Sequence, residues 1–187
     1  MRFSIPHSLR LPTICLICEM SYSHPTPLCP ACIHNLPYLQ NYCQSCGGAV
    51  LPQNFYCSSC IHDGSLIYEF NAPLCYQEPI KNLIQIYKFH QGLDLAAFFA
   101  DLMIKTLTPS CLHSQCLIPV PLHHKRLLER GFHQTWLLAK HLSRKLKIAT
   151  SLNYCQKIKN TSSQASLDKK ARIYNLKDSF VYQKPPY

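Results

Sequence analysis

The sequence has no apolar run long enough to cross a membrane and no recognisable secretion signal. A membrane-spanning helix needs about 20 consecutive apolar residues, and no run in this chain approaches that length. The N-terminus lacks the basic region, apolar stretch and small-residue cleavage site of a signal peptide. Disorder is also excluded, because 47% of the residues are hydrophobic and only 15% are charged. We therefore expect a folded cytoplasmic protein with no transmembrane segment.

Charge is nearly missing from the first 65 residues, which contain no lysine. Their four charged side chains cancel, and they are Arg2, Arg10, Glu19 and Asp63. The net charge of +10 therefore falls on the remainder, where residues 123–177 contain thirteen Lys or Arg and two acidic residues. Such density suits an anionic partner, either a nucleic-acid backbone or a phosphorylated small molecule. A solvated basic surface is the alternative interpretation.

Cysteine is abundant, with twelve residues, and eight of them form regularly spaced Cys-x-x-Cys pairs. The pairs recur every 14 residues as Cys15/Cys18, Cys29/Cys32, Cys43/Cys46 and Cys57/Cys60. Disulfides are rare in a reducing compartment, where paired thiols usually bind metal. A Cys-x-x-Cys knuckle can turn both sulfurs toward one ion, and two knuckles complete the closed tetrahedral set of structural zinc. Eight thiolates therefore predict two structural zinc ions, with no position left for water or substrate.

Neighbouring knuckles are expected to pair, although crossed pairing is an alternative that sequence leaves open. The expected groups are Cys15, Cys18, Cys29 and Cys32 on one ion, and Cys43, Cys46, Cys57 and Cys60 on the other. His24, His34 and His62 lie close by, but complete cysteine pairs make them unnecessary as ligands. We interpret them as surface residues. The segments between the knuckles could hardly bury a core, so metal binding should supply most of the folding energy of residues 1–65.

Residues 66–187 are predicted to form a second domain with alternating strands and helices. Apolar residues at helical spacing predict helices over residues 80–88, 93–107 and 134–147. Residues 116–121 read as a short buried strand, which two prolines convert into a loop. Residues 152–158 read as a further strand. This alternation predicts an α/β domain with a largely parallel sheet.

The predicted loop from Pro119 to Gln134 carries concentrated positive charge directly after a strand. In open α/β sheets, ligands bind beyond the carboxyl ends of the strands. The basic residues of this loop are His123, His124, Lys125, Arg126 and Arg130. Charge-assisted hydrogen bonds from such side chains are suited to phosphate groups.

Two segments resemble signatures of the ComF/GntX family, the competence-associated, phosphoribosyltransferase-like proteins. Residues 118–134 read IPVPLHHKRLLERGFHQ and resemble the family's IPVPLHxxRxxxRGFNQ. Residues 161–180 fit its TxxQxxLxxxxRxxNxxxxF segment. Residues 87–92, YKFHQG, are similar to its weaker (L/Y)K(F/Y)xG element, and the four knuckles resemble its double zinc ribbon. The resemblance covers nearly the whole chain in the family's order.

The resemblance implies a small zinc-ribbon module over residues 1–65, followed by a type I phosphoribosyltransferase-like domain over residues 66–187. Phosphoribosyl pyrophosphate and Mg²⁺ are then the expected ligands. The residues implied near the pyrophosphate are Lys125, Arg126 and Arg130. Those implied for a flexible hood over the site are Thr161, Gln164 and Arg172. His133 stands where the family usually has asparagine, and both can hydrogen-bond through a side-chain nitrogen.

The resemblance also implies a missing part. Type I phosphoribosyltransferases carry a DDVxTTGxT loop that holds the ribose and its 5-phosphate, and no such run follows Phe180. We expect truncation, through a frameshifted or shortened gene or an incomplete fragment. A degenerate homologue is the remaining explanation. In each case we expect phosphoribosyl transfer to be impaired, because the chemistry needs the sugar held in place.

Two non-catalytic functions compete with phosphoribosyl transfer. The basic segment and the aromatic residues suit a factor that binds single-stranded DNA during natural transformation. The zinc ribbon suits an adaptor that docks onto other competence proteins.

Overall fold

The computed structural model describes residues 12–64, 69–89, 92–162, 164 and 167–183. It divides the chain into two compact units, Met1–Leu107 and Thr108–Tyr187. The first 11 residues of the predicted ribbon module and residues 90–91 of the YKFHQG element lie outside the described residues. No helix in the described part of the chain is long and apolar enough to span a membrane.

The first unit opens with a short ladder around the first knuckle. Strand β1 (Thr13–Ile14) pairs antiparallel with β2 (Ser21–Tyr22). Helix α1 (Pro30–His34) begins within the second knuckle, directly after Cys29, which is its N-cap and has an extended backbone. Pro30 suits the first helical position, where no backbone N–H is needed.

The third and fourth knuckles repeat this arrangement. An antiparallel bridge joins Tyr42 to Ala49 on either side of the third knuckle. Helix α2 (Ser58–Asp63) then begins at the fourth knuckle with Cys57 as its N-cap. It ends at Gly64, whose φ of 65° suits glycine.

Two packed helices supply the apolar core of the first unit. Helix α3 (Ile80–Phe89) and helix α4 (Asp94–Ile104) confirm the two helices predicted here, and α4 ends three residues early. The rings of Tyr87 and Phe99 lie 5.9 Å apart between centroids. The buried side chains on these helices include Ile80, Leu83, Tyr87, Leu95, Phe98, Phe99 and Leu102.

The segment between the ribbon and α3 belongs to the same compact unit. The N–H of Leu39 donates to the carbonyl of Pro73 at 3.0 Å, and that of Cys75 donates to Pro37 at 2.8 Å. The boundary between the two compact units lies between residues 107 and 108. The domain boundary predicted near residue 65 rests on composition and stays a prediction.

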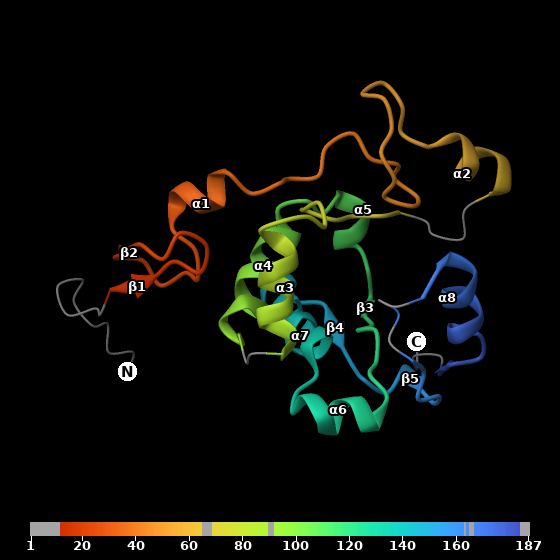
Figure 1. Cartoon of the computed structure of the whole chain (residues 1–187). Coiled ribbons are helices and arrows are strands. Elements are labelled where there is room, and N and C mark those ends of the chain that lie inside the picture. The colour runs from red at the N-terminus through yellow and green to blue at the C-terminus, as the bar shows by residue number, and fades with distance from the viewer. Residues whose placement is uncertain (1–11, 65–68, 90–91, 163, 165–166, 184–187) are drawn as a thin grey trace. The chain divides into compact units, whose positions relative to one another are not determined.

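The second unit contains one parallel pair of strands. After helix α5 (Pro109–Leu112), β3 (Cys116–Leu117) pairs parallel with β4 (Ala149–Thr150). The crossover between them carries helix α6 (His124–Arg130) and helix α7 (Gln134–Leu146), as Figure 1 shows. The buried apolar side chains of this part are Ala139, Leu142 and Ile148.

The rest of the second unit is an antiparallel ladder and one helix. Strand β5 (Cys155–Lys157) pairs with β6 (Phe180–Tyr182), and helix α8 (Lys169–Leu176) precedes β6. The chain is thus mixed α/β. The predicted largely parallel sheet is wrong for the described residues, whose strands form three separate two-stranded ladders of which one is parallel.

Two further predictions for this unit need correction. The predicted buried strand over residues 116–121 shortens to β3, and Val120 is 65% exposed. Pro119 and Pro121 stop ladder pairing, and the carbonyl of Val120 accepts from the Thr135 hydroxyl at 2.6 Å instead. The predicted basic loop contains helix α6, which ends at Gly131 with a φ of 77°.

Candidate metal centres and phosphate-binding site

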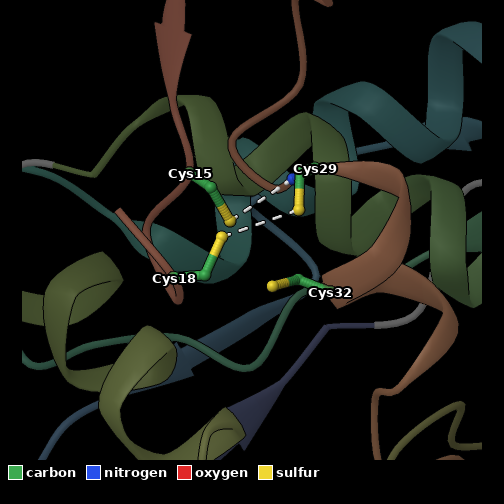
Figure 2. A group of neighbouring side chains, drawn as sticks. All are labelled: Cys15, Cys18, Cys29 and Cys32. Carbon is green, nitrogen blue, oxygen red and sulfur yellow. Dashed lines mark hydrogen bonds between the residues drawn. The ribbon is translucent and has the colours of Figure 1, made fainter. Parts of the chain in front are cut away.

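The eight knuckle thiols gather into two groups of four. The groups are Cys15, Cys18, Cys29 and Cys32, and Cys43, Cys46, Cys57 and Cys60. Within each group all sulfurs lie within 4.8 Å of one another. Figure 2 shows the first group, with the four side chains turned toward a common centre. Neighbouring knuckles therefore pair as predicted, and the crossed alternative is not observed.

The sulfur spacing fits tetrahedral zinc. Zinc bonded to four sulfurs at about 2.3 Å sets those sulfurs about 3.8 Å apart. The Cys18 and Cys29 sulfurs lie 3.8 Å apart, and the Cys46 and Cys57 sulfurs lie 3.7 Å apart. The donor set and the spacing fit two structural zinc ions, which would be held entirely by thiolates.

The two centres repeat with a period of 28 residues, twice the period seen in sequence. In each centre the first knuckle lies in a turn, and the second begins a short helix. The N–H of Glu19 donates to the Cys15 carbonyl at 2.9 Å, and 28 residues later the N–H of Gly47 donates to Cys43 at 2.8 Å. Glu19 and Gly47 both have positive φ, at 59° and 73°. Alternate knuckles thus have different structural roles.

Backbone donors prepare one sulfur of each centre to be a thiolate. Although burial raises the pKa of the Cys15 thiol, backbone N–H groups, first those of Cys18 and Cys29, lower it to about 6. The pKa of Cys43 falls to about 6 for the same reasons.

The last sulfur of each centre shows the opposite shift. Burial and the neighbouring sulfurs raise the pKa of Cys32 to about 12. The sulfurs of Cys57 and Cys46, followed by burial, do the same for Cys60. Zinc must therefore displace protons from part of each group.

The nearby histidines are not part of either sulfur group. His24 Nδ1 lies 3.4 Å from the Thr26 hydroxyl, and His62 Nδ1 lies 2.8 Å from the Asp63 carboxylate. Both histidines and His34 are exposed. Their interpretation as surface residues agrees with these positions.

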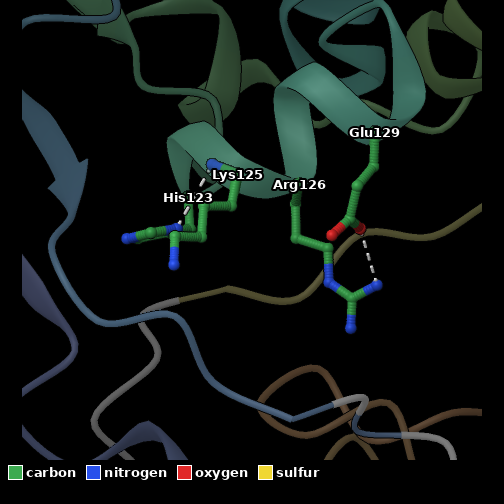
Figure 3. Close-up of polar contacts among 4 residues, drawn as sticks. All are labelled: His123, Lys125, Arg126 and Glu129. Carbon is green, nitrogen blue, oxygen red and sulfur yellow. Dashed lines mark hydrogen bonds and ion pairs between the residues drawn. The ribbon is translucent and has the colours of Figure 1, made fainter.

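The basic residues predicted for phosphate binding lie on α6. Arg126 and Arg130 are four residues apart and so share a helix face, and Lys125 directly precedes Arg126 in the first turn of the helix. Arg126 donates to the Glu129 carboxylate at 3.1 Å, and Figure 3 shows these two side chains turned toward each other. Burial, and then Arg126, lowers the pKa of Arg130.

Two histidines fix the ends of this segment. His123 is 7% exposed and caps α6, with its Nδ1 accepting from the Lys125 N–H at 3.3 Å (Figure 3). His133 caps α7, with its Nδ1 3.3 Å from the Trp136 N–H and its Nε2 3.3 Å from the Leu122 N–H. A neutral imidazole accepts at one nitrogen only, so His133 can accept from just one of these two N–H groups at a time. Asparagine, the usual family residue here, is also a strong N-cap, which explains why histidine can replace it.

Lys157 on β5 joins the basic residues of α6, and sequence reasoning did not single it out. Its Nζ donates to the Thr161 hydroxyl at 2.7 Å. Burial, and then Arg126, lowers the pKa of Lys157. The pKa of His123 is lowered by burial and by neighbouring cations that include Lys157. We call Lys157, Arg126, His123 and Lys125 the basic cluster.

The parallel pairing of β3 and β4 explains why the cluster forms. Parallel strands end at the same edge of a sheet, so the segments that follow them lie close together. The segment after β3 carries α6, and the segment after β4 leads to Lys157. The strand predicted over residues 152–158 corresponds to β5, whereas β4 at residues 149–150 was not predicted. Recognition of β4 as the partner of β3 would have indicated that Lys157 lies near α6.

The residues predicted for the hood are held by backbone contacts. Arg172 Nε donates to the Gln164 carbonyl at 3.0 Å, and Asn175 Nδ2 donates to the Ser162 carbonyl at 3.1 Å. Both donors lie on α8, three residues apart and therefore on one face. The side chains of Arg172 and Asn175 thus hold the segment that contains Thr161 and Gln164 against α8. We call this pair of donors the α8 clasp.

Comparison with known proteins gives matches over both units. The double zinc ribbon domain matches residues 7–61. Competence protein F of Haemophilus influenzae is 31% identical over 161 residues, which cover 82% of this chain and 69% of that protein. The DNA utilization protein YhgH of Salmonella typhimurium is 25% identical over 184 residues, covering 95% of this chain and 81% of that protein. YhgH of Escherichia coli K12 is 24% identical over the same length. No solved structure matches.

The match to competence protein F extends well beyond the zinc ribbon. The match covers 82% of this chain, whereas the first unit holds 107 of the 187 residues, so the match must extend into the second unit. The residues that match the double zinc ribbon domain contain all eight knuckle cysteines. The chain therefore belongs to the ComF family, the family of competence protein F.

Proposed function

We propose that this chain acts in DNA uptake and that its second unit binds the phosphate groups of a phosphorylated ligand. The proposal rests on the parallel pairing of β3 and β4, which brings the segments of Lys157 and Arg126 to one edge, and on the electrostatic interaction of Lys157 with Arg126 and His123. Like charges held together repel one another, and a bound anion relieves that repulsion. The relatives named for competence and DNA utilization support the biological setting.

The charge balance of the second unit supports an anionic ligand. Residues 108–187 contain fourteen Lys or Arg and three acidic residues, which are Glu129, Asp168 and Asp178. Glu129 is engaged by Arg126, and Asp168 accepts from the N–H of Ala171 as the N-cap of α8. Two of the three carboxylates therefore serve local contacts.

Phosphoribosyl pyrophosphate is the proposed small ligand, on a type I phosphoribosyltransferase fold. Lys125, Arg126, Arg130 and Lys157 would donate to its phosphate oxygens, while Thr161 and Gln164 would lie beside them. Mg²⁺ would arrive with the ligand, because protein-bound Mg²⁺ usually keeps several waters and is held partly by substrate phosphates. Bound Mg²⁺ would neutralise part of the pyrophosphate charge. We place this function in the cytoplasm, where thiols stay reduced and free to bind zinc.

Isothermal titration calorimetry tests the proposed ligand. The titrants are phosphoribosyl pyrophosphate and inorganic pyrophosphate, each with and without Mg²⁺. We expect saturable heat for both, and Arg126→Gln and Lys157→Gln should each weaken binding roughly tenfold, as a lost hydrogen bond to a charged group does. Lys170→Gln, an exposed change on α8, is the matched control and should leave binding unchanged.

The absence of heat at millimolar ligand would exclude phosphoribosyl pyrophosphate for this chain. An equal loss in the Lys170→Gln control would show that net charge, rather than the basic cluster, determines binding.

A second candidate function is binding of single-stranded DNA. It is favoured by the side chains of β6, where Phe180 and Tyr182 are 38% and 60% exposed beside Lys157. Cations that follow the phosphate backbone and aromatic rings that stack on bases are the usual elements of such binding. Both functions use the basic cluster for phosphate.

A further inference from the structure

We propose that β6 is a stacking surface for the bases of single-stranded DNA, with the basic cluster holding the adjoining phosphates. This inference rests on the second candidate function and names the surface that would carry it. The proposed occupant is a nucleic acid rather than an apolar protein partner, because the face and the unit around it carry positive charge.

The register of the β5–β6 ladder places two aromatic rings and one cation on the same face. Cys155 pairs with Tyr182, and Lys157 pairs with Phe180. Alternate residues of a strand share a face, so Phe180 and Tyr182 lie together with Lys157, whereas Val181 points to the opposite face. The two rings are about 6.8 Å apart along the strand, so each can contact a base of one DNA strand.

Exposure and a cation contact indicate that this face is open to a ligand. Tyr182 is 60% exposed and Phe180 is 38% exposed, so each residue keeps part of its surface open to solvent. The Nζ of Lys157 lies 5.7 Å from the centre of the Phe180 ring. Lys157 is thus shared between the aromatic face and the basic cluster, and it connects a base-stacking surface to a phosphate-binding one.

Charge decides between nucleic acid and an apolar protein partner. An apolar docking surface usually has few charges at its centre. Here Lys157 lies on this face, directly opposite Phe180 in the ladder, and the second unit has fourteen basic and three acidic residues. This combination is typical of sites that bind single strands by stacking and by backbone charge.

The test compares two DNA probes that differ only in their bases. Fluorescence anisotropy is measured with a labelled 20-mer of oligo-dT and with an abasic oligomer of the same length and charge, at two salt concentrations. The intact chain should bind oligo-dT at least tenfold more tightly than the abasic probe. Equal affinity for the two probes would overturn the stacking surface while leaving phosphate binding in place.

Variants then assign the effect to residues. The double change Phe180→Leu with Tyr182→Leu should reduce oligo-dT affinity to that of the abasic probe and leave the abasic affinity unchanged. Lys157→Gln should weaken both probes and reduce the slope of log affinity against log salt by about 1. Val181→Ala, on the opposite face, is the matched control and should change neither.

Each remaining outcome is decisive. A double variant that keeps the preference for oligo-dT overturns the assignment to β6. Failure of the intact chain to bind either probe overturns the inference together with the second candidate function, while pyrophosphate binding would still be judged by calorimetry. Should the double variant misfold, as Trp136 fluorescence would reveal, the comparison of probes on the intact chain still decides whether bases are bound.

Discussion

At the scale of single residues, His133 stands where the family signature has asparagine. It occupies the N-cap of α7, where its ring accepts a backbone N–H that asparagine would otherwise accept. Histidine adds a property that asparagine lacks, because protonation removes its acceptor nitrogen. Burial, followed by the charge of Arg130, lowers the pKa of His133 and favours the neutral ring.

The stability of the second unit should therefore fall in mild acid. A histidine has a pKa near 6.5 in the unfolded chain, and the folded pKa is lower, so the unfolded state binds more protons as pH falls. The stabilisation present above about pH 6.5 is lost below it. His133→Asn should keep stability at pH 7.5 and weaken this pH dependence, while His133→Ala should cost about 1 kcal/mol at pH 7.5.

Urea unfolding at pH 7.5 and pH 5, followed by Trp136 fluorescence, measures this effect. Trp136 is the only tryptophan of the chain and lies on α7, so it reports on the second unit. His123 also has a lowered pKa, and it should leave some pH dependence in the asparagine variant. An unchanged pH dependence in His133→Asn would contradict the role assigned to His133.

Gly47 is predicted to be required in the second metal centre. Its φ is 73°, and an added Cβ would overlap the ring of Phe70. Gly47→Ala should therefore cost about 1–3 kcal/mol and weaken zinc binding in competition with a chelator. Gly64→Ala is the control, because its φ is also positive while a Cβ there meets nothing within 4 Å, so only the smaller backbone cost remains. Equal effects of the two changes would show that Phe70 does not restrict this turn.

At the scale of elements, the α8 clasp gives the second family segment a positioning role. The resemblance implied that Arg172 belongs to a flexible hood over the ligand. In the structure its guanidinium donates to the backbone carbonyl of Gln164, and Asn175 donates to that of Ser162. The clasp thus fixes the segment beside Lys157, which holds Thr161 through its ammonium group.

Removal of the clasp should loosen that segment. Arg172→Ala should cost about 1 kcal/mol of local stability and speed amide hydrogen exchange in a peptide covering residues 159–168. Lys170→Ala, an exposed change on the same helix, should leave exchange unchanged. If Arg172→Ala instead weakens pyrophosphate binding with no change in exchange, Arg172 contacts the ligand directly rather than positioning the segment.

The sequence predicted elements best where spacing alone determines them. The knuckle cysteines determine the metal centres, because a Cys-x-x-Cys turn brings its own two sulfurs together whatever the rest of the fold does. Helices α3 and α7 were found because their apolar residues follow helical spacing. Lys157 was not found, because its meeting with α6 depends on which short strands pair. Helix α6 was not found either, because charged residues fill most of its seven positions and conceal its period.

At the scale of the whole molecule, the two units divide charge and metal between them. The zinc centres lie in a stretch with almost no charge, and the basic cluster lies in a unit without a metal group among its described residues. Such a division predicts that metal affects one unit and that anions affect the other.

Metal content should be two zinc ions per chain, lost one at a time. Cys15→Ser should reduce the zinc content from two to one, and Cys43→Ser should do the same, because each sulfur belongs to one group only. Atomic emission on the purified protein measures the ratio. A single variant that loses both ions would show that the centres fold as one unit.

Removal of both ions should unfold the ribbon and spare the second unit. Metal supplies most of the folding energy of such small modules. After zinc is stripped with a chelator, amide exchange over residues 12–64 should rise sharply. The urea midpoint reported by Trp136 should stay unchanged, since that residue lies in the other compact unit. A shift in that midpoint would show that zinc stabilises both units.

The 28-residue period of the metal centres has a consequence for synthesis. All ligands of the first ion lie between Cys15 and Cys32, and all ligands of the second lie between Cys43 and Cys60. Chains are made from the N-terminus, and contacts between near neighbours form fast. The first centre can therefore close on a ribosome-bound chain before the second has emerged from the ribosome, and both can close before the basic cluster emerges. Both metal centres would therefore be complete before the basic cluster can fold.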